Sequence, residues 1–340
     1  MAVAATQESD PILLREALNY RGNALHVQGK FDEAVRDLER AMELLPSQLR
    51  SSRLESTLLH NFGLAYFRQG KYRRAEECHR KDQIICRVMG DVRGEAQVMV
   101  TLGDTLRKLE DFEKASTILE AAADIFELLG DVRWLSITRL NLALSYQDAR
   151  QPAVAYIIYL LSAALQANRE LHETHGEALA SMNLGWAYFL RCPNHHIVSA
   201  QYWTEQAQSL FRKIGATRQE AQASLNIGGL YAMRGDISGA RSQLEQALAV
   251  FAEHGMANEA RVARSRLKHI GKSKTGVQEC SCQLSDDPKF RSVLNTWLED
   301  LPHAMLRGDN ARVDEFLFMI PRHDRSIRFL RWRLVDRQCT

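Results

Sequence analysis

Long apolar runs are missing from this chain: no stretch reaches the 18 or more apolar residues that a membrane-spanning helix needs. The first residues, MAVAATQESDP, have neither a basic leader nor an apolar core, so we expect no secretory signal there. Net charge is also small, because 44 basic residues nearly balance 42 acidic residues to give +2. Such a balance provides no strong electrostatic field, so we expect no nucleic-acid partner. The lack of a long apolar run means that we also expect no membrane span.

A disulfide framework is absent as well. The six cysteines are scattered, and only Cys280 and Cys282 lie close together, without a second pair at zinc spacing. In a long chain without a signal, this predicts reduced thiols, a cytoplasmic location, no metal and no other cofactor.

Catalytic motifs are missing too: there is no P-loop, no Gly-x-Gly-x-x-Gly, no His-Glu-x-x-His and no nucleophile elbow. His195 and His196 are expected to lie in a loop after Pro193, where no carboxylate or cysteine completes a metal site. We therefore expect that the protein is not an enzyme.

What the chain does have is a small pattern that returns six times. An apolar residue precedes a glycine or alanine, a large residue follows three later, and an alanine comes about nine beyond that. The runs are Gly22-Leu25-Ala34, Gly63-Tyr66-Ala75, Gly103-Leu106-Ala115, Ala143-Tyr146-Ala155, Gly185-Tyr188-Ala200 and Gly228-Tyr231-Ala240, spaced by 40 to 43 positions. A fixed period near 40 indicates stacked units, each unable to bury its apolar face alone.

The second unit shows how each repeat is built. Apolar residues up to Tyr66 recur at spacings of three and four, which predicts an amphipathic helix that ends at Gly70. A second helix follows and ends near Gly90, after which Asp91 is placed to cap the next helix. The small residues Gly63 and Ala75 are expected where the two helices cross, because missing side chains allow close approach.

These features resemble the tetratricopeptide repeat, and the matches span about residues 14–271. The first unit carries Leu18, Gly22, Leu25, Gly29, Phe31, Ala34, Leu38, Ala41 and Pro46, and the sixth fits nearly as well. The third unit has Glu110 in place of the turn glycine. The resemblance implies an all-α, right-handed superhelical solenoid of antiparallel helix hairpins.

The period is longer than the common 34 residues. With joints such as Gly90-Asp91 and helix starts such as Gly94-Glu95-Ala96, it is similar to the repeats of Pins/LGN spindle-orientation scaffolds, rapsyn and kinesin light chains. That likeness implies extended helices and a peptide-binding groove lined by the first helix of each hairpin.

The expected organisation has four parts. Residues 1–13 form a disordered N-terminus, and residues 14–271 form six repeats with a capping helix. Residues 272–286 form a linker, because Gly271 to Gly276 lacks an apolar period. Residues 287–340 form a short helical tail in which arginines and aromatic residues are interleaved. This tail either docks on the array or contacts a second protein.

One row of groove positions, two residues before each small residue, reads Tyr20, Asn61, Thr101, Asn141, Asn183 and Asn226. An asparagine amide has both a donor and an acceptor, so this row can pair with the backbone of an extended peptide. The alternative is that these amides bond to a neighbouring hairpin and are structural.

Other candidate groove residues are Asn23, Arg68, Asp104, Arg107, Lys108, Gln147 and Trp186. Arg68, Arg107 and Lys108 would make the early groove basic and suited to an acidic segment, unless they form an ordinary solvated helix face. The later positions, including Trp186, would give an apolar lining.

The function that these residues favour is a non-enzymatic intracellular adaptor or scaffold that binds an extended or helical segment of a partner protein. Two alternatives stay open. The chain is a structural or assembly subunit of a large complex, or a solenoid that senses a ligand and regulates another protein.

Overall fold

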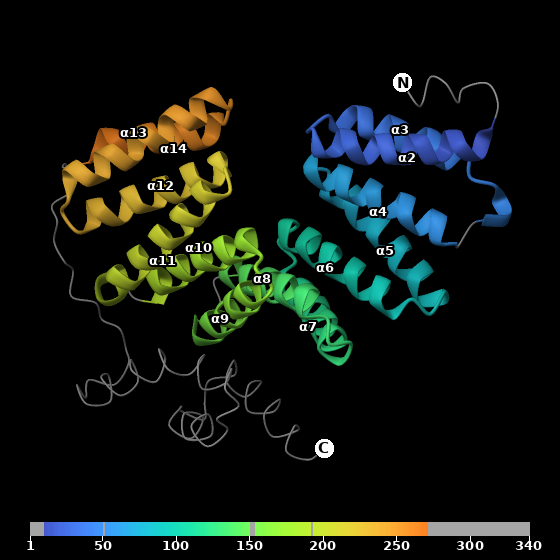
Figure 1. Cartoon of the computed structure of the whole chain (residues 1–340), viewed down its shortest axis with the longest axis horizontal. Helices are drawn as coiled ribbons and strands as arrows, with labels where there is room; N and C mark the ends of the chain where they lie inside the picture. The colour runs from blue at the N-terminus through green and yellow to red at the C-terminus, as the bar shows by residue number, and fades with distance from the viewer. Residues whose placement is uncertain (1–9, 50–51, 150–153, 192, 271–340) are drawn as a thin grey trace, which may run out of the picture. The chain divides into compact units, whose positions relative to one another are not determined.

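The computed structural model of the protein describes residues 10–270, apart from 50–51, 150–153 and 192. All regular elements in this part of the chain are helices, as predicted, and the ribbon in Figure 1 contains no strand. The chain divides into two compact units, with the boundary after Ala149.

The first unit contains three helix hairpins and one further helix. The hairpins are α2 (Pro11–Val27) with α3 (Phe31–Glu43), α4 (Arg53–Arg68) with α5 (Tyr72–Val88), and α6 (Val92–Lys108) with α7 (Phe112–Leu128). Helix α8 (Val132–Asp148) packs against α6 and α7. The array thus begins at Pro11, slightly before the expected residue 14, and Pro at the first position suits a helix start.

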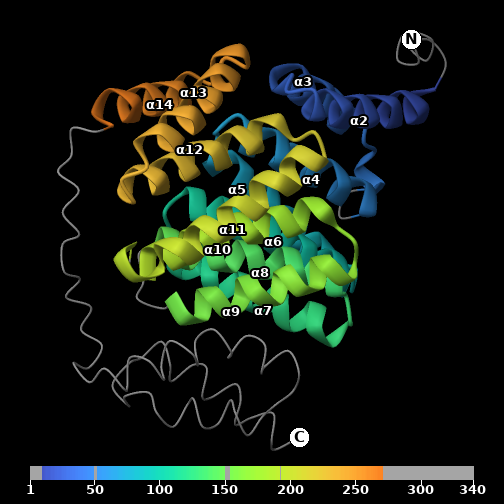
Figure 2. The ribbon, with the colours of Figure 1, turned by 60° about the vertical axis from the view of Figure 1, so that its left-hand side comes forward.

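The second unit begins with α9 (Val154–Glu170), which packs against α10 (Thr174–Arg191). Two hairpins follow, α10 with α11 (Pro193–Lys213) and α12 (Thr217–Met233) with α13 (Ile237–Glu253). Helix α14 (Ala257–His269) packs along α13 and ends the described chain, as Figures 1 and 2 show. A helix was predicted here, and its role as the cap of the array stays a prediction.

Helix ends follow the expected chemistry. Asp91 lies at the N-cap of α6, and its side chain accepts a hydrogen bond from the backbone N–H of Gly94 at 2.9 Å. The hairpin turn at Gly70 has a φ of 74°, which glycine adopts without strain. Glu110 takes the corresponding position between α6 and α7 with a φ of 63°.

One expectation about the fifth hairpin is wrong. His195 and His196 do not lie in a loop, because α11 already begins at Pro193 and includes both residues. The ring of His196 is buried and lies 5.9 Å from the ring of Tyr188. The proline occupies the first helical position, where its missing N–H breaks no intrahelical bond.

Where the small residue of a first helix is glycine, it lies against the second helix of the same hairpin. A side-chain carbon added to Gly22 would lie 3.0 Å from Cγ of Leu38, and one added to Gly103 would lie 2.5 Å from Cγ of Leu119. At Gly63, however, the nearest atoms belong to His79 and not to Ala75, which is itself fully buried. The two helices therefore approach each other closely at Gly63, as predicted, but Gly63 lies against His79 and not against Ala75.

Exposed ion pairs recur at the joints between repeats. Arg53 contacts Asp91 at 3.0 Å and Arg93 contacts Asp131 at 2.7 Å, so equivalent residues pair one repeat apart. Each such pair contributes about 0.2–1 kcal/mol, because the arginines are solvated. Their repetition still favours one register between neighbouring hairpins.

The linker and the tail at residues 272–340, including Cys280 and Cys282, lie outside the described residues. None of the described helices combines the length and the hydropathy that crossing a lipid bilayer requires.

Candidate partner-binding surfaces

The first helices of successive hairpins, α2, α4, α6 and α8, pack beside one another in the first unit. We call the side of these helices that carries the asparagine row the first-helix face. It includes Asn23, which is exposed, and Asn61, which is half-buried.

Asn61 is already hydrogen-bonded within the protein. Its Nδ2 donates to Oδ1 of Asn19 at 2.7 Å, which joins α4 to α2. This contact matches the alternative interpretation of the row, in which an amide bonds to the neighbouring hairpin. A ligand would have to compete with that bond.

Thr101, at the next position of the row, also has a partner inside the protein. Its hydroxyl donates to the carbonyl oxygen of Val98 at 2.9 Å and lies 3.4 Å from Nδ1 of His79. Because that hydroxyl hydrogen is used, the contact is consistent with Nδ1 of His79 donating to Thr101 Oγ1. Sequence reasoning missed this pair, since the two residues come from different repeats.

Asn141 and Asn226 differ from these two positions. Both are half-buried, and neither side chain forms a hydrogen bond with another described residue. Asn183, at the equivalent position of α10, is half-buried and does have a polar interaction. The row therefore contains one amide that bonds to a neighbouring helix, and two that form no hydrogen bond with another described residue.

Two of the charged candidates, Asp104 and Arg107, lie together in the C-terminal half of α6. Arg107 donates from Nε to Oδ1 of Asp104 at 3.0 Å and from Nη1 to Oδ2 of Asp148, which joins α6 to α8. Burial lowers the pKa of the Arg107 guanidinium, but the two carboxylates outweigh it and raise the pKa above its ordinary value. Arg107 thus presents no free positive charge.

The remaining polar candidates are not drawn into this cluster. Arg68 and Lys108 are exposed and form no ion pair with another described residue, whereas Gln147 is buried and has a polar interaction of its own. Only Arg68 and Lys108 of the three expected basic residues are therefore available to an acidic segment.

In the second unit the equivalent face of α10 and α12 carries exposed apolar side chains beside Asn183 and Asn226. Trp186 of α10 is 47% exposed and its ring stacks on that of Phe189, with centroids 5.2 Å apart. Arg266 of α14 donates to the backbone oxygen of Leu225 in α12 at 2.7 Å. This arginine reaches α12 from the next repeat, a contact that no sequence motif indicated.

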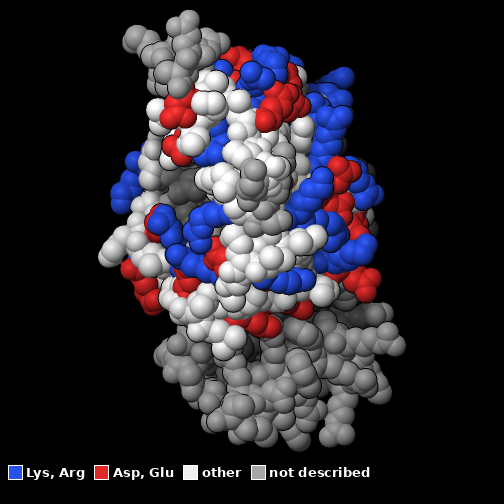
Figure 3. All heavy atoms as spheres, turned by 90° about the vertical axis from the view of Figure 1, so that its right-hand side faces the viewer, with Lys and Arg blue, Asp and Glu red and all other residues white. Residues whose placement is uncertain are grey.

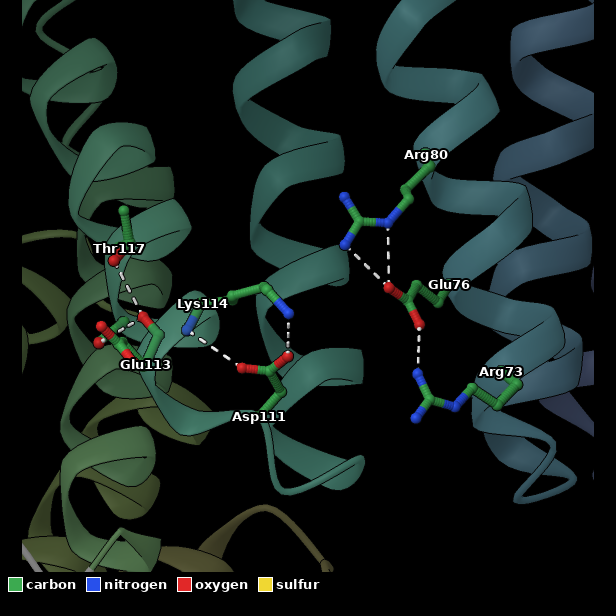
Figure 4. A network of polar contacts seen from close by, with 8 residues as sticks. Arg73, Glu76, Arg80, Asp111, Glu113, Lys114 and Thr117 are labelled. Carbon is green, nitrogen blue, oxygen red and sulfur yellow. Dashed lines mark hydrogen bonds and ion pairs between the residues drawn. The ribbon is translucent and has the colours of Figure 1, made fainter.

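Several charged side chains of the second helices lie on the outside and pair with one another. Figure 4 shows Glu76 of α5 between Arg73 and Arg80, and Asp111 accepting a bond from Nζ of Lys114 at 2.6 Å. On the face drawn in Figure 3, acidic and basic side chains are intermixed. These surfaces offer no large field of one sign.

Among the described residues, no group of three or more His, Cys, Asp or Glu side chains is placed so that it could hold a metal ion.

Comparison with known families identifies the repeat. A family model described as tetratricopeptide repeat matches residues 13–81, and a second model with the same description matches residues 96–127. A segment of 99 residues is 32% identical to G-protein-signaling modulator 1 of Homo sapiens. It covers 29% of this chain and 14% of that protein, so the chain corresponds to a small part of this relative.

Solved structures share the fold. A Rap protein complexed with competence and sporulation factor gives a TM-score of 0.66 at 15% identity, covering 98% of this chain and 88% of that one. NprR in complex with its cognate peptide NprX gives 0.59 at 12% identity, covering 99% and 91%. A putative kinesin light chain of Podosopora anserina gives 0.50 at 18% identity, covering 62% and 100%. At these identities the likeness concerns the fold alone.

Proposed function

We propose that this tetratricopeptide repeat protein is a non-enzymatic adaptor that binds an extended segment of a partner protein on its first-helix faces. The observation that carries the proposal is the pair Asn141 and Asn226. These two amides occupy equivalent positions in different repeats, are half-buried, and form no hydrogen bond with another described residue.

A half-buried amide needs hydrogen-bond partners for its donors and its acceptor. An asparagine side chain has two donors and an acceptor, which match the alternating N–H and C=O groups of an extended backbone. Asparagine is also a poor helix former, so its recurrence inside helices needs a compensating role. At position 61 that role is the bond to Asn19, whereas at positions 141 and 226 the amide remains available.

Two proteins of the same fold support this assignment. The Rap structure contains competence and sporulation factor, and the NprR structure contains its cognate peptide. Binding of a peptide segment is therefore compatible with such an array of helix hairpins.

The test begins with peptides selected on the full-length protein from a displayed library of short random sequences. Isothermal titration then compares wild type with Asn141→Ala and Asn226→Ala. Each amide that bonds a peptide backbone contributes about 0.5–1.5 kcal/mol, so each substitution should raise the Kd of a peptide bound on its unit by roughly 2- to 12-fold. The melting temperature should hardly change, because no core side chain is removed.

Asn61→Ala is the matched control. It removes an amide from the same row, but one that is bonded to Asn19. We expect it to lower the melting temperature and to change peptide affinity less than the other two variants. The proposal is wrong if selected peptides bind the two alanine variants as tightly as wild type.

A further inference from the structure

Arg266 of α14 reaches across to α12 with most of its hydrogen-bond donors unused. Its Nη1 donates to the backbone oxygen of Leu225 at 2.7 Å, and this is its one hydrogen bond with another described residue. A guanidinium has five N–H donors in a planar fork, so most donors of Arg266 have no partner among the described residues. The residue as a whole is exposed, and a ligand can therefore reach these donors.

A glycine opens the place where Arg266 lies. A side-chain carbon added to Gly229 of α12 would lie 3.1 Å from Nη1 and 3.7 Å from Cζ of Arg266. Glycine inside a helix is unfavourable relative to alanine, so its presence there needs a reason. The equivalent positions of α4, α6 and α10 carry side chains, namely Leu64, Asp104 and Trp186. The bare backbone at Gly229 lets the guanidinium lie directly against α12.

The guanidinium lies on the side of α12 that carries the asparagine row. Asn226 and Gly229 are three residues apart, and residues at that spacing are neighbours on a helix surface. The Asn226 amide forms no hydrogen bond with another described residue. An unpaired amide and a guanidinium with unused donors therefore lie within one turn of α12.

The charge of Arg266 is not balanced by a carboxylate among the described residues. Residues 221–233 of α12 contain no Lys, Arg, Asp or Glu, and α14 has four Lys or Arg residues but only Glu259 as an acidic one. Partial burial lowers the pKa of the Arg266 guanidinium. For Arg107, two carboxylates outweigh the same effect and raise the pKa. A bound anion would give Arg266 the interactions that it loses through burial.

We propose that Arg266 binds a carboxylate of the partner segment while Asn226 binds the backbone of that segment. The inference rests on the proposed function and adds the chemistry of the segment bound on the second unit. This segment carries an Asp or Glu side chain or ends in a free C-terminal carboxylate. A carboxylate fits because it accepts two parallel N–H bonds from one guanidinium, and the net positive charge of α14 attracts it.

The test uses the full-length protein and peptides selected on it from a displayed library of short random sequences. Peptides whose Kd rises with Asn226→Ala are assigned to this site. Each is synthesised unchanged, with every Asp and Glu replaced by Asn and Gln, and with an amidated C-terminus. One of the two altered forms should bind about 10-fold more weakly in isothermal titration, and that form identifies the source of the carboxylate.

Variants then show which arginine reads the carboxylate. With Arg266→Gln, the unchanged and altered peptides should have Kd values within about 2-fold of each other. Glutamine can still donate to the oxygen of Leu225, so we expect the fold to be kept. Arg264→Gln is the matched control, because Arg264 is exposed on the same helix and its loss changes the net charge equally. It lies two residues away, on another side of α14, and should preserve the difference between the peptides.

Melting curves show whether the variants are folded. If Arg266→Gln unfolds the protein, Arg266→Lys replaces it, since lysine keeps a donor for Leu225 but has no planar fork, and the difference between the peptides should again shrink.

Three results would overturn the inference and leave the proposed function standing. The altered peptides bind as tightly as the unchanged ones, or Arg264→Gln reduces the difference as much as Arg266→Gln does. The third is a lower melting temperature of Arg266→Gln with an intact difference, which would mean that Arg266 only holds α14 against α12. If no selected peptide depends on Asn226, the proposed function fails at the second unit and the inference fails with it.

Discussion

The imidazole of His79 occupies the space into which a side chain of Gly63 would project. A carbon attached to Cα of Gly63 would lie 2.2 Å from Cε1 of His79, far inside van der Waals contact. His79 is fully buried, and the residues at the same position of three other repeats are Leu38, Leu119 and Leu244. In the second repeat, a polar ring therefore fills the space between the two helices of the hairpin, where those three other repeats have leucine.

The first prediction follows from this contact. Gly63→Ala should lower the free energy of unfolding by roughly 1–3 kcal/mol, because the ring of His79 has to move within a packed core. Gly22→Ala is the matched control, since its added carbon meets Cγ of Leu38 at the milder distance of 3.0 Å. Urea unfolding followed by circular dichroism measures both. Equal losses in the two variants would show that His79 is easily displaced.

The second prediction concerns pH. Burial, together with the charge of His60, whose ring lies 6.1 Å away, lowers the pKa of His79 to about 3. The unfolded chain has the ordinary value of 6.5 and binds the proton first, so stability is complete above pH 6.5 and is lost as the pH falls toward 3. Between pH 7 and pH 5 the loss from this residue should be about 2 kcal/mol.

His79→Leu separates this effect from other titrating groups, because leucine is the residue that three other repeats have at this position. It also removes Nε2, a buried nitrogen without a hydrogen-bond partner among the described residues. Urea titrations at several pH values should show that the variant loses about 2 kcal/mol less than wild type over this range. Identical pH profiles would mean that His79 is not buried as a neutral ring.

The third prediction concerns the turn between α6 and α7. Glu110 has a φ of 63°, in the left-handed region that costs a non-glycine residue roughly 1–2 kcal/mol. Glu110→Gly removes that cost but makes the unfolded chain more flexible, so we expect a net stabilisation of about 0.5–1 kcal/mol. Thermal melting should show a higher midpoint, whereas Gly70→Ala, at a φ of 74°, should lower it. The idea fails if Glu110→Gly lowers the midpoint.

The sequence predicted the helix hairpins well because the signals that define them are local. Gly70 and Asp91 act within one turn of the chain, and the structure places them at a helix stop and a helix cap, as expected. The prediction of a loop at His195 was wrong for a local reason too, since Pro193 can begin a helix as readily as interrupt one.

The candidate binding residues were less predictable, because their state depends on partners in other repeats. Asn61 and Asn141 look alike in the sequence, yet only Asn61 has a hydrogen bond to a neighbouring helix. Arg107 likewise loses its expected role as a free charge through Asp148, which lies in the next repeat. No periodicity within a single repeat reports such contacts.

The contact between Thr101 and His79 also has a meaning for the order of the hairpins. The helix that carries His79 must be followed by one with a small hydroxyl at the facing position, and Thr101 is the only such residue in its row. An otherwise interchangeable hairpin taken from elsewhere in the array would bring asparagine or tyrosine against the ring. A duplication or deletion between the second and third repeats would therefore be penalised, because it would separate His79 from Thr101.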